Sequence, residues 1–221
     1  MIKILTGRPG GGKTYNAAML MKYALRRGQN VISTVPIDID YVSKNGRKKI
    51  GDYKHIPINE ITPEHLHKYM AYNHEKGKER QTLVFIDECQ IIFNARHWNQ
   101  NGRLEWILFF THHRHLGFDI YLITQSDSFV DKQIRPLIEI EVKHRKISNY
   151  LWWLPFTAFV QREEWYGHSQ KVKISSNFLL CLPSVYKIYD SHTIYDEIYE
   201  KYKTHQEAKA VSTAELNANE S

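Results

Sequence analysis

A glycine-rich segment near the start of the chain constrains the fold more than any other feature, because it matches the phosphate-binding pattern G-x-x-x-x-G-K-T. The segment and the tyrosine that follows it are Gly7, Arg8, Pro9, Gly10, Gly11, Gly12, Lys13, Thr14 and Tyr15. Glycines let backbone N–H groups converge on the β- and γ-phosphates in conformations that other residues resist. We therefore expect these residues to bind ATP. Lys13 would act as a mobile charge on the phosphates and in catalysis, and the Thr14 hydroxyl as a ligand of Mg²⁺.

The segments on either side of this loop have the secondary structure that a phosphate site needs. Residues 2–6 form a short apolar run typical of a buried strand, and residues 13–27 read as a helix that ends at Gly28. A helix that starts at the loop directs the positive end of its dipole at bound phosphates. The strand–loop–helix order therefore favours nucleotide binding over an empty glycine-rich turn.

Strands and helices alternate along the first two thirds of the chain. Further strands are predicted at residues 30–35, 83–86, 119–124 and 138–146. Further helices are predicted from Thr62 to near Gly77, at 104–115 and at 131–137. Because the first strand leads into the phosphate loop, this alternation predicts an α/β fold in which helices cover both faces of a mainly parallel sheet.

Two segments of this core are expected to have particular features. Residues 36–60 look less regular, with a hairpin-like turn at Asn45-Gly46. The helix at 104–115 carries large apolar side chains widely around its circumference, at Trp106, Leu108, Phe109 and Phe110. We therefore expect that helix to be sandwiched between layers of the fold.

The pattern changes after Lys146, which sets the expected domain organisation. Residues 1–146 form the core, 147–203 a C-terminal β/α extension packed on it, and 204–221 a disordered polar tail. The extension is rich in aromatic and basic residues and has a helix predicted at 194–202. That composition suits single-stranded nucleic acid or anionic lipid headgroups, and it suits equally an aromatic core beneath solvated lysines.

Composition bounds the cellular setting. Cys89 and Cys181 provide no disulfide framework and fit a reducing compartment. The chain starts directly at its first strand, without a signal peptide, and contains no run of about 20 apolar residues. Its net charge of +6 favours anionic partners. We therefore expect a cytoplasmic chain.

Two adjacent carboxylates supply the other parts that hydrolysis requires. Asp87 and Glu88 directly follow the apolar strand at 83–86. Asp87 would hold Mg²⁺ through water at the carboxyl edge of the sheet, and Glu88 would act as the general base for the attacking water. The alternative for Glu88 is that it caps the next turn. The pair favours hydrolysis over phosphoryl transfer to a small metabolite.

Three further polar residues are candidates for the catalytic site. Gln125 ends the fourth strand, where it would sense the γ-phosphate or bond only to backbone. Arg114 precedes that strand and Arg135 follows it, so either would reach the γ-phosphate of a neighbouring subunit as an arginine finger. The alternative for each arginine is a surface position or a pairing with a carboxylate.

Several motifs occur in an order that belongs to a known family. They are D-E-C at 87–89, F-N-A-R-H-W-N at 93–99, H-R-H-L-G-F-D-I at 113–120 and V-D-K-Q-I-R at 130–135. With these motifs the chain resembles the zonular occludens toxin (Zot) family, which includes the gene I assembly ATPases of filamentous phages, the inoviruses. The resemblance runs from Met1 to about Arg145, and Y-K-I-Y-D-S at 186–191 is similar to the closing segment of the family.

The resemblance implies a P-loop ATPase of the FtsK/HerA kind, with strand order 5-1-4-3-2. It implies a homo-oligomeric ring at the cytoplasmic face of the host inner membrane, which drives assembly and extrusion of single-stranded-DNA virions. The implied partners are phage coat and assembly proteins, with single-stranded DNA as a further candidate. In the superfamily an arginine near the start of the fourth strand acts in trans, which favours Arg114 over Arg135, and a glutamine at the end of that strand matches Gln125.

The chain departs from the family in one respect. Family members usually continue into a transmembrane helix and an extracytoplasmic domain, whereas this sequence ends in a polar tail. It is therefore expected to be the cytoplasmic portion of a longer protein or a short member brought to the membrane by a partner. The toxin activity is tied to the outer portion and is not supported. The alternative to a motor is a nucleotide-gated scaffold or Zot-like effector that docks coat or host proteins without sustained hydrolysis.

Overall fold

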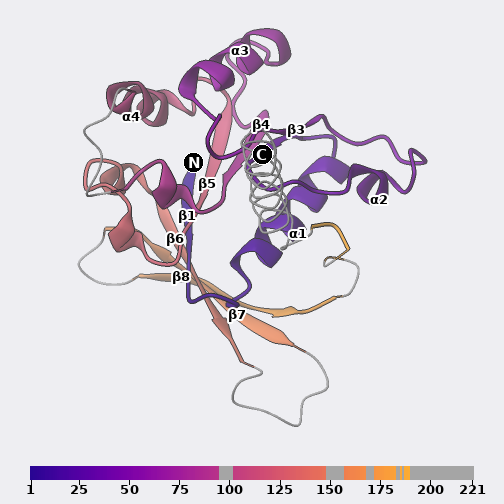
Figure 1. The fold of residues 1–221 in the computed structure, drawn as a ribbon, viewed down its shortest axis with the longest axis vertical. Helices are drawn as coiled ribbons and strands as arrows, with labels where there is room; N and C mark the ends of the chain where they lie inside the picture. Colours follow the sequence, from indigo (N-terminus) through magenta and orange to yellow (C-terminus); the bar gives the residue numbers. More distant parts are fainter. Residues whose placement is uncertain (95–101, 148–156, 168–171, 183–184, 186, 190–221) are drawn as a thin grey trace, which may run out of the picture. The chain divides into compact units, whose positions relative to one another are not determined.

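The computed structural model describes residues 1–94, 102–147, 157–167, 172–182, 185 and 187–189. The chain divides into two compact units, Met1–Tyr189 and Asp190–Ser221, and all described residues lie in the first. They contain one eight-stranded sheet of order β3-β2-β4-β5-β1-β6-β7-β8 (Figure 1). The strands are β1 Ile2–Thr6, β2 Asn30–Ser33, β3 Tyr53–His55, β4 Thr82–Ile86, β5 Phe118–Ile123, β6 Ile140–Lys146, β7 Ala158–Trp165 and β8 Lys173–Leu180.

The expected strand order is confirmed for the five strands that the sequence predicts. Read from β6, the order β6-β1-β5-β4-β2 is the expected 5-1-4-3-2, and every neighbouring pair within it is parallel. The structure adds strands at both edges, so the full order is longer than expected. β3 pairs in parallel with β2, and β7 and β8 extend the other edge in antiparallel fashion.

The segment at 36–60 differs from the expected hairpin. It holds a short helix, α2 Ile39–Ser43, and then the strand β3. Lys44, Asn45 and Gly46 all have positive φ, and Lys44 is the C-cap of α2. An Asn-Gly pair supplies left-handed backbone both for hairpin turns and for the ends of helices, and here it ends a helix.

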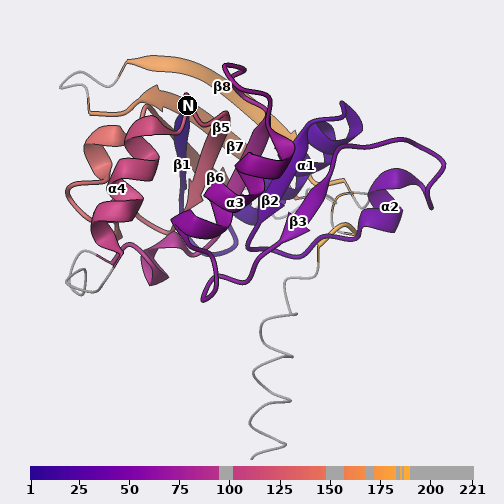
Figure 2. The ribbon, with the colours of Figure 1, turned by 90° about the horizontal axis from the view of Figure 1, so that it is seen from above.

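The two faces of the sheet are covered by different helices, as expected. α1 Lys13–Arg26 and α2 pack on one face, and α3 Pro63–Asn73 and α4 Arg103–His112 pack on the other (Figures 1 and 2). Alternate residues of each strand belong to the hydrophobic cores on opposite faces of the sheet. Ile4 and Val84 point toward α3 and α4, whereas Leu5 and Phe85 point toward α1. The carboxyl ends of the parallel strands therefore meet at one edge, where the phosphate loop leaves β1.

The expectation that α4 is sandwiched between layers is wrong. Trp106, Phe109 and Phe110 are buried, but Leu104 is 68% exposed and Leu108 is 50% exposed. Among the described residues the helix therefore buries one side only: its three aromatic rings pack in the core beneath it, and Leu104 and Leu108 lie on the exposed side.

Within the span 131–137, where a short helix is expected, the structure forms a single 3₁₀ turn, η3 Arg135–Leu137, and another 3₁₀ turn, η2 Asp127–Phe129, precedes that span. Pro136 lacks an N–H and disfavours α conformation in the residue before it, so a longer helix does not form.

Several sequence-based expectations lie wholly or largely outside the described residues. They are the helix at 194–202, the tail at 204–221 and the tryptophans at 152 and 153. The division at residues 146 and 203 stays a prediction, although β7 and β8 continue the sheet of the core. No helix in the described part of the chain is long and apolar enough to cross a membrane.

Candidate nucleotide-binding site

The phosphate loop connects the end of β1 to the start of α1. Its first N–H, from Gly7, donates to the Gln125 carbonyl at 3.3 Å, and the Gly11 N–H donates to the Arg8 carbonyl at 2.9 Å. Gly7 and Gly12 have φ of 147° and 92°. A Cβ on Gly7 would lie 2.5 Å from the His144 carbonyl, and one on Gly12 would lie 2.7 Å from the Phe159 ring. Both positions therefore require glycine on two grounds, backbone conformation and space.

Lys13 is held inside the loop. Its side chain is buried, and Nζ donates to the carbonyls of Gly7 at 2.9 Å and Arg8 at 3.3 Å. Burial lowers the pKa of this amine, while the negative charges of Asp87 and Glu88 act in the opposite direction. The ammonium thus lies where the loop backbone converges, in the position expected for contact with phosphates.

Thr14 and Asp87 meet across the site. The Thr14 hydroxyl donates to Asp87 Oδ2 at 2.9 Å, and the other carboxylate oxygen accepts the Glu88 N–H at 2.8 Å. The Thr34 hydroxyl accepts the Asp87 N–H at 2.8 Å, which anchors the end of β4 to the segment after β2. Burial raises the pKa of Asp87, opposed by the hydrogen bonds that the carboxylate accepts. A hydroxyl and a carboxylate this close form the oxygen donor set that suits Mg²⁺, so the residues fit the expected metal.

Glu88 follows Asp87 in a left-handed conformation with φ of 48°. It precedes the 3₁₀ turn η1 Cys89–Ile91, but its side chain makes no capping hydrogen bond. The carboxylate instead accepts a hydrogen bond from Gln90 Nε2. The alternative that Glu88 caps the next turn is therefore wrong. A non-glycine residue held at positive φ is the kind of local strain that concentrates at functional sites.

Gln125 lies beside the loop, because its carbonyl accepts the Gly7 N–H and β5 pairs with β1. Its side chain is exposed. The structure thus brings Gln125 to the same edge of the sheet as Lys13 and Asp87, and its role as a γ-phosphate sensor stays a prediction.

The two candidate arginines have different surroundings. Arg114 lies at the amino edge of the sheet, before β5, and forms an ion pair with Glu139. The loop lies at the other end of β1, roughly 17 Å away for a strand of this length. Arg135 donates to the carbonyls of Val130 at 2.8 Å and Ser128 at 2.6 Å. Arg114 therefore contacts a carboxylate, and any action on a nucleotide would be on that of a neighbouring subunit.

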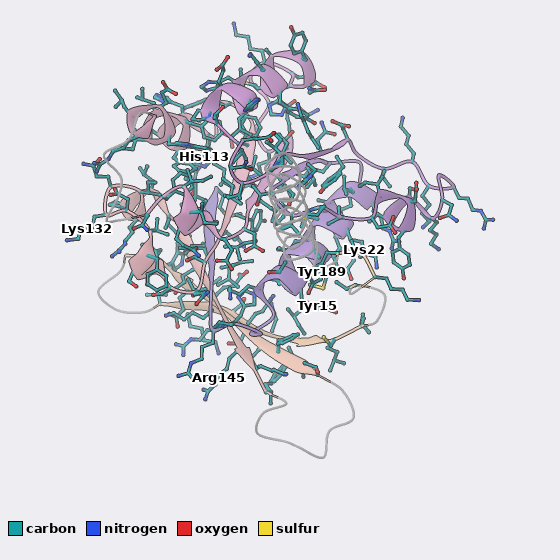
Figure 3. All side chains as sticks on the ribbon, viewed as in Figure 1. Tyr15, Lys22, His113, Lys132, Arg145 and Tyr189 are labelled. Carbon is teal, nitrogen blue, oxygen red and sulfur yellow. The ribbon has the colours of Figure 1, made fainter. Side chains whose placement is uncertain are left out.

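Tyr15 is buried next to the loop. Its ring packs on Phe159, and its hydroxyl donates to the Leu180 carbonyl and accepts the Leu182 N–H, both at 2.9 Å. Figure 3 labels Tyr15. The side chain thus joins α1 to the end of β8, and the backbone N–H is the group of Tyr15 that would serve a nucleotide.

A buried histidine on β6, His144, packs against the phosphate loop at Gly7. His144 Nδ1 lies 3.3 Å from the Thr6 carbonyl, and Nε2 lies 3.0 Å from Asn16 Nδ2 and 3.3 Å from Gln161 Nε2. This arrangement fits a neutral ring that donates from Nδ1 and accepts at Nε2. Burial lowers the pKa of His144 to about 4. Sequence reasoning missed His144, Thr34 and Gln90, because each becomes part of the site only through contacts that the fold creates.

The neutral His144 is expected to make the fold sensitive to mild acid. The unfolded chain takes up a proton on this residue near pH 6.5, whereas the folded protein does so only near pH 4, so stability falls as pH drops between those values. We expect the free energy of unfolding of the wild type to fall by about 2 kcal/mol more than that of His144→Gln between pH 7 and pH 5. Urea unfolding at a series of pH values measures this difference.

His115→Gln is the matched control, since the side chain of His115 is exposed. The free energy of unfolding of His115→Gln should depend on pH in the same way as that of the wild type. Parallel pH dependence of the wild type and His144→Gln would show that His144 is not held neutral by the fold.

Comparison with known proteins agrees with this geometry. The Zonular occludens toxin (Zot) family matches residues 1–195. The chain is 29% identical over 134 residues to the Gene 1 protein of Enterobacteria phage I2-2, covering 61% of this chain and 37% of that protein. It is also 29% identical over 159 residues to the Gene 1 protein of Enterobacteria phage fd, covering 71% and 45%. The chain thus spans less than half the length of these relatives.

Solved structures share the fold. The N-terminal domain of zonular occludens toxin from Neisseria meningitidis superimposes with a TM-score of 0.53 at 19% identity, over 86% of this chain and 98% of that one. A DnaB-like replicative helicase has a TM-score of 0.56 at 12% identity, over 85% of this chain and 58% of that one. The architecture is that of a P-loop NTPase, and the family match extends over most of the chain. The chain belongs to the zonular occludens toxin family.

Proposed function

We propose that this chain is the ATPase portion of a filamentous-phage assembly protein, which couples hydrolysis of Mg-ATP to assembly and extrusion of single-stranded-DNA virions. The observation that carries the proposal is the 2.9 Å contact between Thr14 Oγ1 and Asp87 Oδ2, beside Lys13 and Glu88. These are the parts that a hydrolytic phosphate site requires. The similarity to Gene 1 proteins of phages I2-2 and fd supports the phage setting.

Each part has a defined task in hydrolysis. The loop N–H groups and Lys13 would neutralise the phosphate oxygens, and Thr14 and Asp87 would hold Mg²⁺, which would supply positive charge to offset the negative charge of the phosphates. Glu88 accepts the proton of the attacking water, and its carboxylate is oriented by the hydrogen bond from Gln90. Gln125 would contact the γ-phosphate from the end of β5.

Arg114 is proposed to complete the site of a neighbouring subunit in a homo-oligomeric ring. Its place at the edge opposite the loop puts it out of reach of its own nucleotide, which suits a residue that acts in trans. The ring would work at the cytoplasmic face of the inner membrane, held there by a segment outside this sequence or by a partner. Phage coat and assembly proteins are its proposed partners.

Arg114 acting in trans predicts that ATP turnover per subunit rises with protein concentration. We expect phosphate release per subunit to increase as the chain is concentrated through its assembly range, and Arg114→Ala to lower the plateau at least tenfold. Light scattering on the same samples reports assembly.

Glu139→Gln separates this role from a structural one, because it breaks the Arg114–Glu139 pair and leaves the arginine in place. If Arg114 acts as a finger, Glu139→Gln keeps its activity. Turnover per subunit that is independent of dilution, or equal losses in both variants, would contradict action in trans.

A further inference from the structure

A cavity of about 490 Å³ lies between α1 and the loop that follows α2, away from the nucleotide site. Its walls are Lys22, Arg26, Tyr41, Lys44, Asn45 and Arg47, which we call the basic pocket. Four of these six side chains are cationic, and none is acidic. The exposed Lys48 and Lys49 continue the same loop. Positive charge is therefore concentrated around one concave surface.

The walls of the basic pocket are fixed by hydrogen bonds between distant segments. Lys22 and Arg26 are four residues apart on α1 and so share one face of that helix. Arg26 Nε donates to the Val42 carbonyl at 3.2 Å, which joins α1 to α2. The Gly51 N–H donates to the Leu25 carbonyl at 2.8 Å, and a Cβ on Gly51 would lie 2.1 Å from the Gln29 carbonyl. The loop is thus fastened to the end of α1, and the pocket is preformed.

The cations in the pocket lie close enough to affect each other. Lys22 is only 8% exposed, and its Nζ lies 5.9 Å from the centre of the Tyr41 ring. Burial lowers the pKa of Lys22, and the nearby Arg26 lowers it further. Like charges gathered in a partly buried space are unfavourable by themselves, and a bound anion relieves that cost.

We propose that the basic pocket binds the phosphate backbone of a single-stranded nucleic acid. Four cations spread around one cavity suit several linked phosphates better than one isolated phosphate. Tyr41 and Asn45 add an aromatic face and an amide, which are groups that contact bases.

The surroundings favour nucleic acid over a membrane. Among the large hydrophobic side chains from Lys22 to Lys49, a stretch described throughout, that of Tyr23 on α1 is the exposed one. Binding at a bilayer surface normally combines cations with apolar side chains that enter the acyl region. Beside the cations of the basic pocket, Tyr23 is an aromatic side chain with a polar hydroxyl, and no aliphatic side chain from Lys22 to Lys49 is exposed to enter the acyl region.

The basic pocket is distinct from the nucleotide site but lies on the same helix. Lys13 and Thr14 begin α1 and Arg26 ends it, so the two sites are roughly 20 Å apart along one rigid element. Binding of nucleic acid at the pocket does not require that the chain hydrolyse ATP. The two proposals can therefore fail independently.

Fluorescence anisotropy with a short labelled oligothymidylate, in the absence of nucleotide, tests the proposal. The pocket variant is Lys44→Gln/Arg47→Gln, because both side chains are exposed and their loss should not affect folding. We expect it to weaken oligothymidylate binding at least about fivefold. The slope of log affinity against log salt should fall by about 1.4, which corresponds to two lost phosphate contacts.

Lys76→Gln/Lys132→Gln is the matched control, since it removes the same charge from exposed lysines elsewhere; Figure 3 labels Lys22 and Lys132 on opposite sides of the view. It should bind oligothymidylate like the wild type. Equal weakening in both double variants would mean binding to overall charge and would overturn the proposal.

Two further probes, anionic lipid vesicles and inorganic phosphate, test whether the basic pocket binds an anion other than nucleic acid. Vesicles of phosphatidylcholine and phosphatidylserine should bind no better to the wild type than to the pocket variant, and inorganic phosphate at millimolar concentration should not displace the oligothymidylate. Pocket-dependent vesicle binding without oligothymidylate binding would assign the surface to a membrane and overturn the proposal. Displacement by inorganic phosphate would show that the pocket binds a single anion and would also overturn the proposal.

Discussion

Replacing Glu88 with glutamine is expected to lower the kcat for ATP hydrolysis by a factor on the order of 10² to 10⁴, while ATP binding stays close to that of the wild type. Glutamine has nearly the same shape and keeps an oxygen that can accept the hydrogen bond from Gln90. It cannot take a proton from water. The loss should therefore fall on turnover and leave affinity unchanged, which steady-state phosphate release and calorimetric titration with ATP measure separately.

Glu64→Gln is the control for this prediction, because Glu64 is an exposed carboxylate on α3 that pairs with its helix neighbour Lys68. It should hydrolyse ATP normally. If Glu88→Gln also turns over within about twofold of the wild type, the water is activated by another group and Glu88 has only a structural role.

Replacing Lys13 with alanine is expected to remove both binding and turnover. The buried ammonium supplies the positive charge at the point where the loop converges, and no other lysine or arginine of the loop is buried with it. Negative charge develops on the phosphates in the transition state, and Lys13 is a preorganised positive charge beside them. Its loss should therefore lower kcat/KM on the order of 10³-fold or more. Calorimetric titration with ATPγS and phosphate release measure the two effects.

Lys68→Ala provides the comparison, since it removes an exposed lysine of similar length. The melting temperature of Lys13→Ala should stay near that of the wild type, because the hydrogen bonds of Lys13 Nζ run to carbonyls of the loop itself. Wild-type affinity in Lys13→Ala would show that the triphosphate binds elsewhere on the chain.

The parts of the site that could be predicted are those encoded by neighbouring residues. The loop at Gly7 to Thr14 carries its chemistry in its own spacing, and Asp87 and Glu88 follow an apolar strand directly. The parallel order of the five inner strands follows from the alternation of strands and helices together with the resemblance to the family. The structure has the predicted order of these five strands and brings the loop and Asp87 together through the Thr14–Asp87 hydrogen bond.

The parts that could not be predicted depend on contacts between distant segments. Thr34 anchors Asp87 from 53 residues away. His144 contacts Asn16 from 128 residues away in the sequence, on β6, which the fold places next to β1. β3 has only three residues, too few for a periodic pattern. The apolar side chains on α4 are visible in the sequence, but whether Leu104 and Leu108 find a second layer depends on what the fold places there.

Tyr15 illustrates the same limit inside the motif. Its position next to Thr14 suggests contact with the nucleotide, whereas its hydroxyl is used by the backbone at Leu180 and Leu182. The segment after β8 is thereby attached to the helix that carries the phosphate loop. A local pattern identifies which backbone groups meet the phosphates, and the side-chain direction is decided by packing.

The most direct measurement of the central claim is a time course of phosphate release from Mg-ATP by the purified wild-type chain, beside Lys13→Ala and Glu88→Gln and with magnesium removed by chelation. We predict continued release over many turnovers by the wild type, abolished in both variants and without magnesium. ATP binding by the wild type with no sustained release at any protein concentration would contradict a motor and favour a nucleotide-gated scaffold.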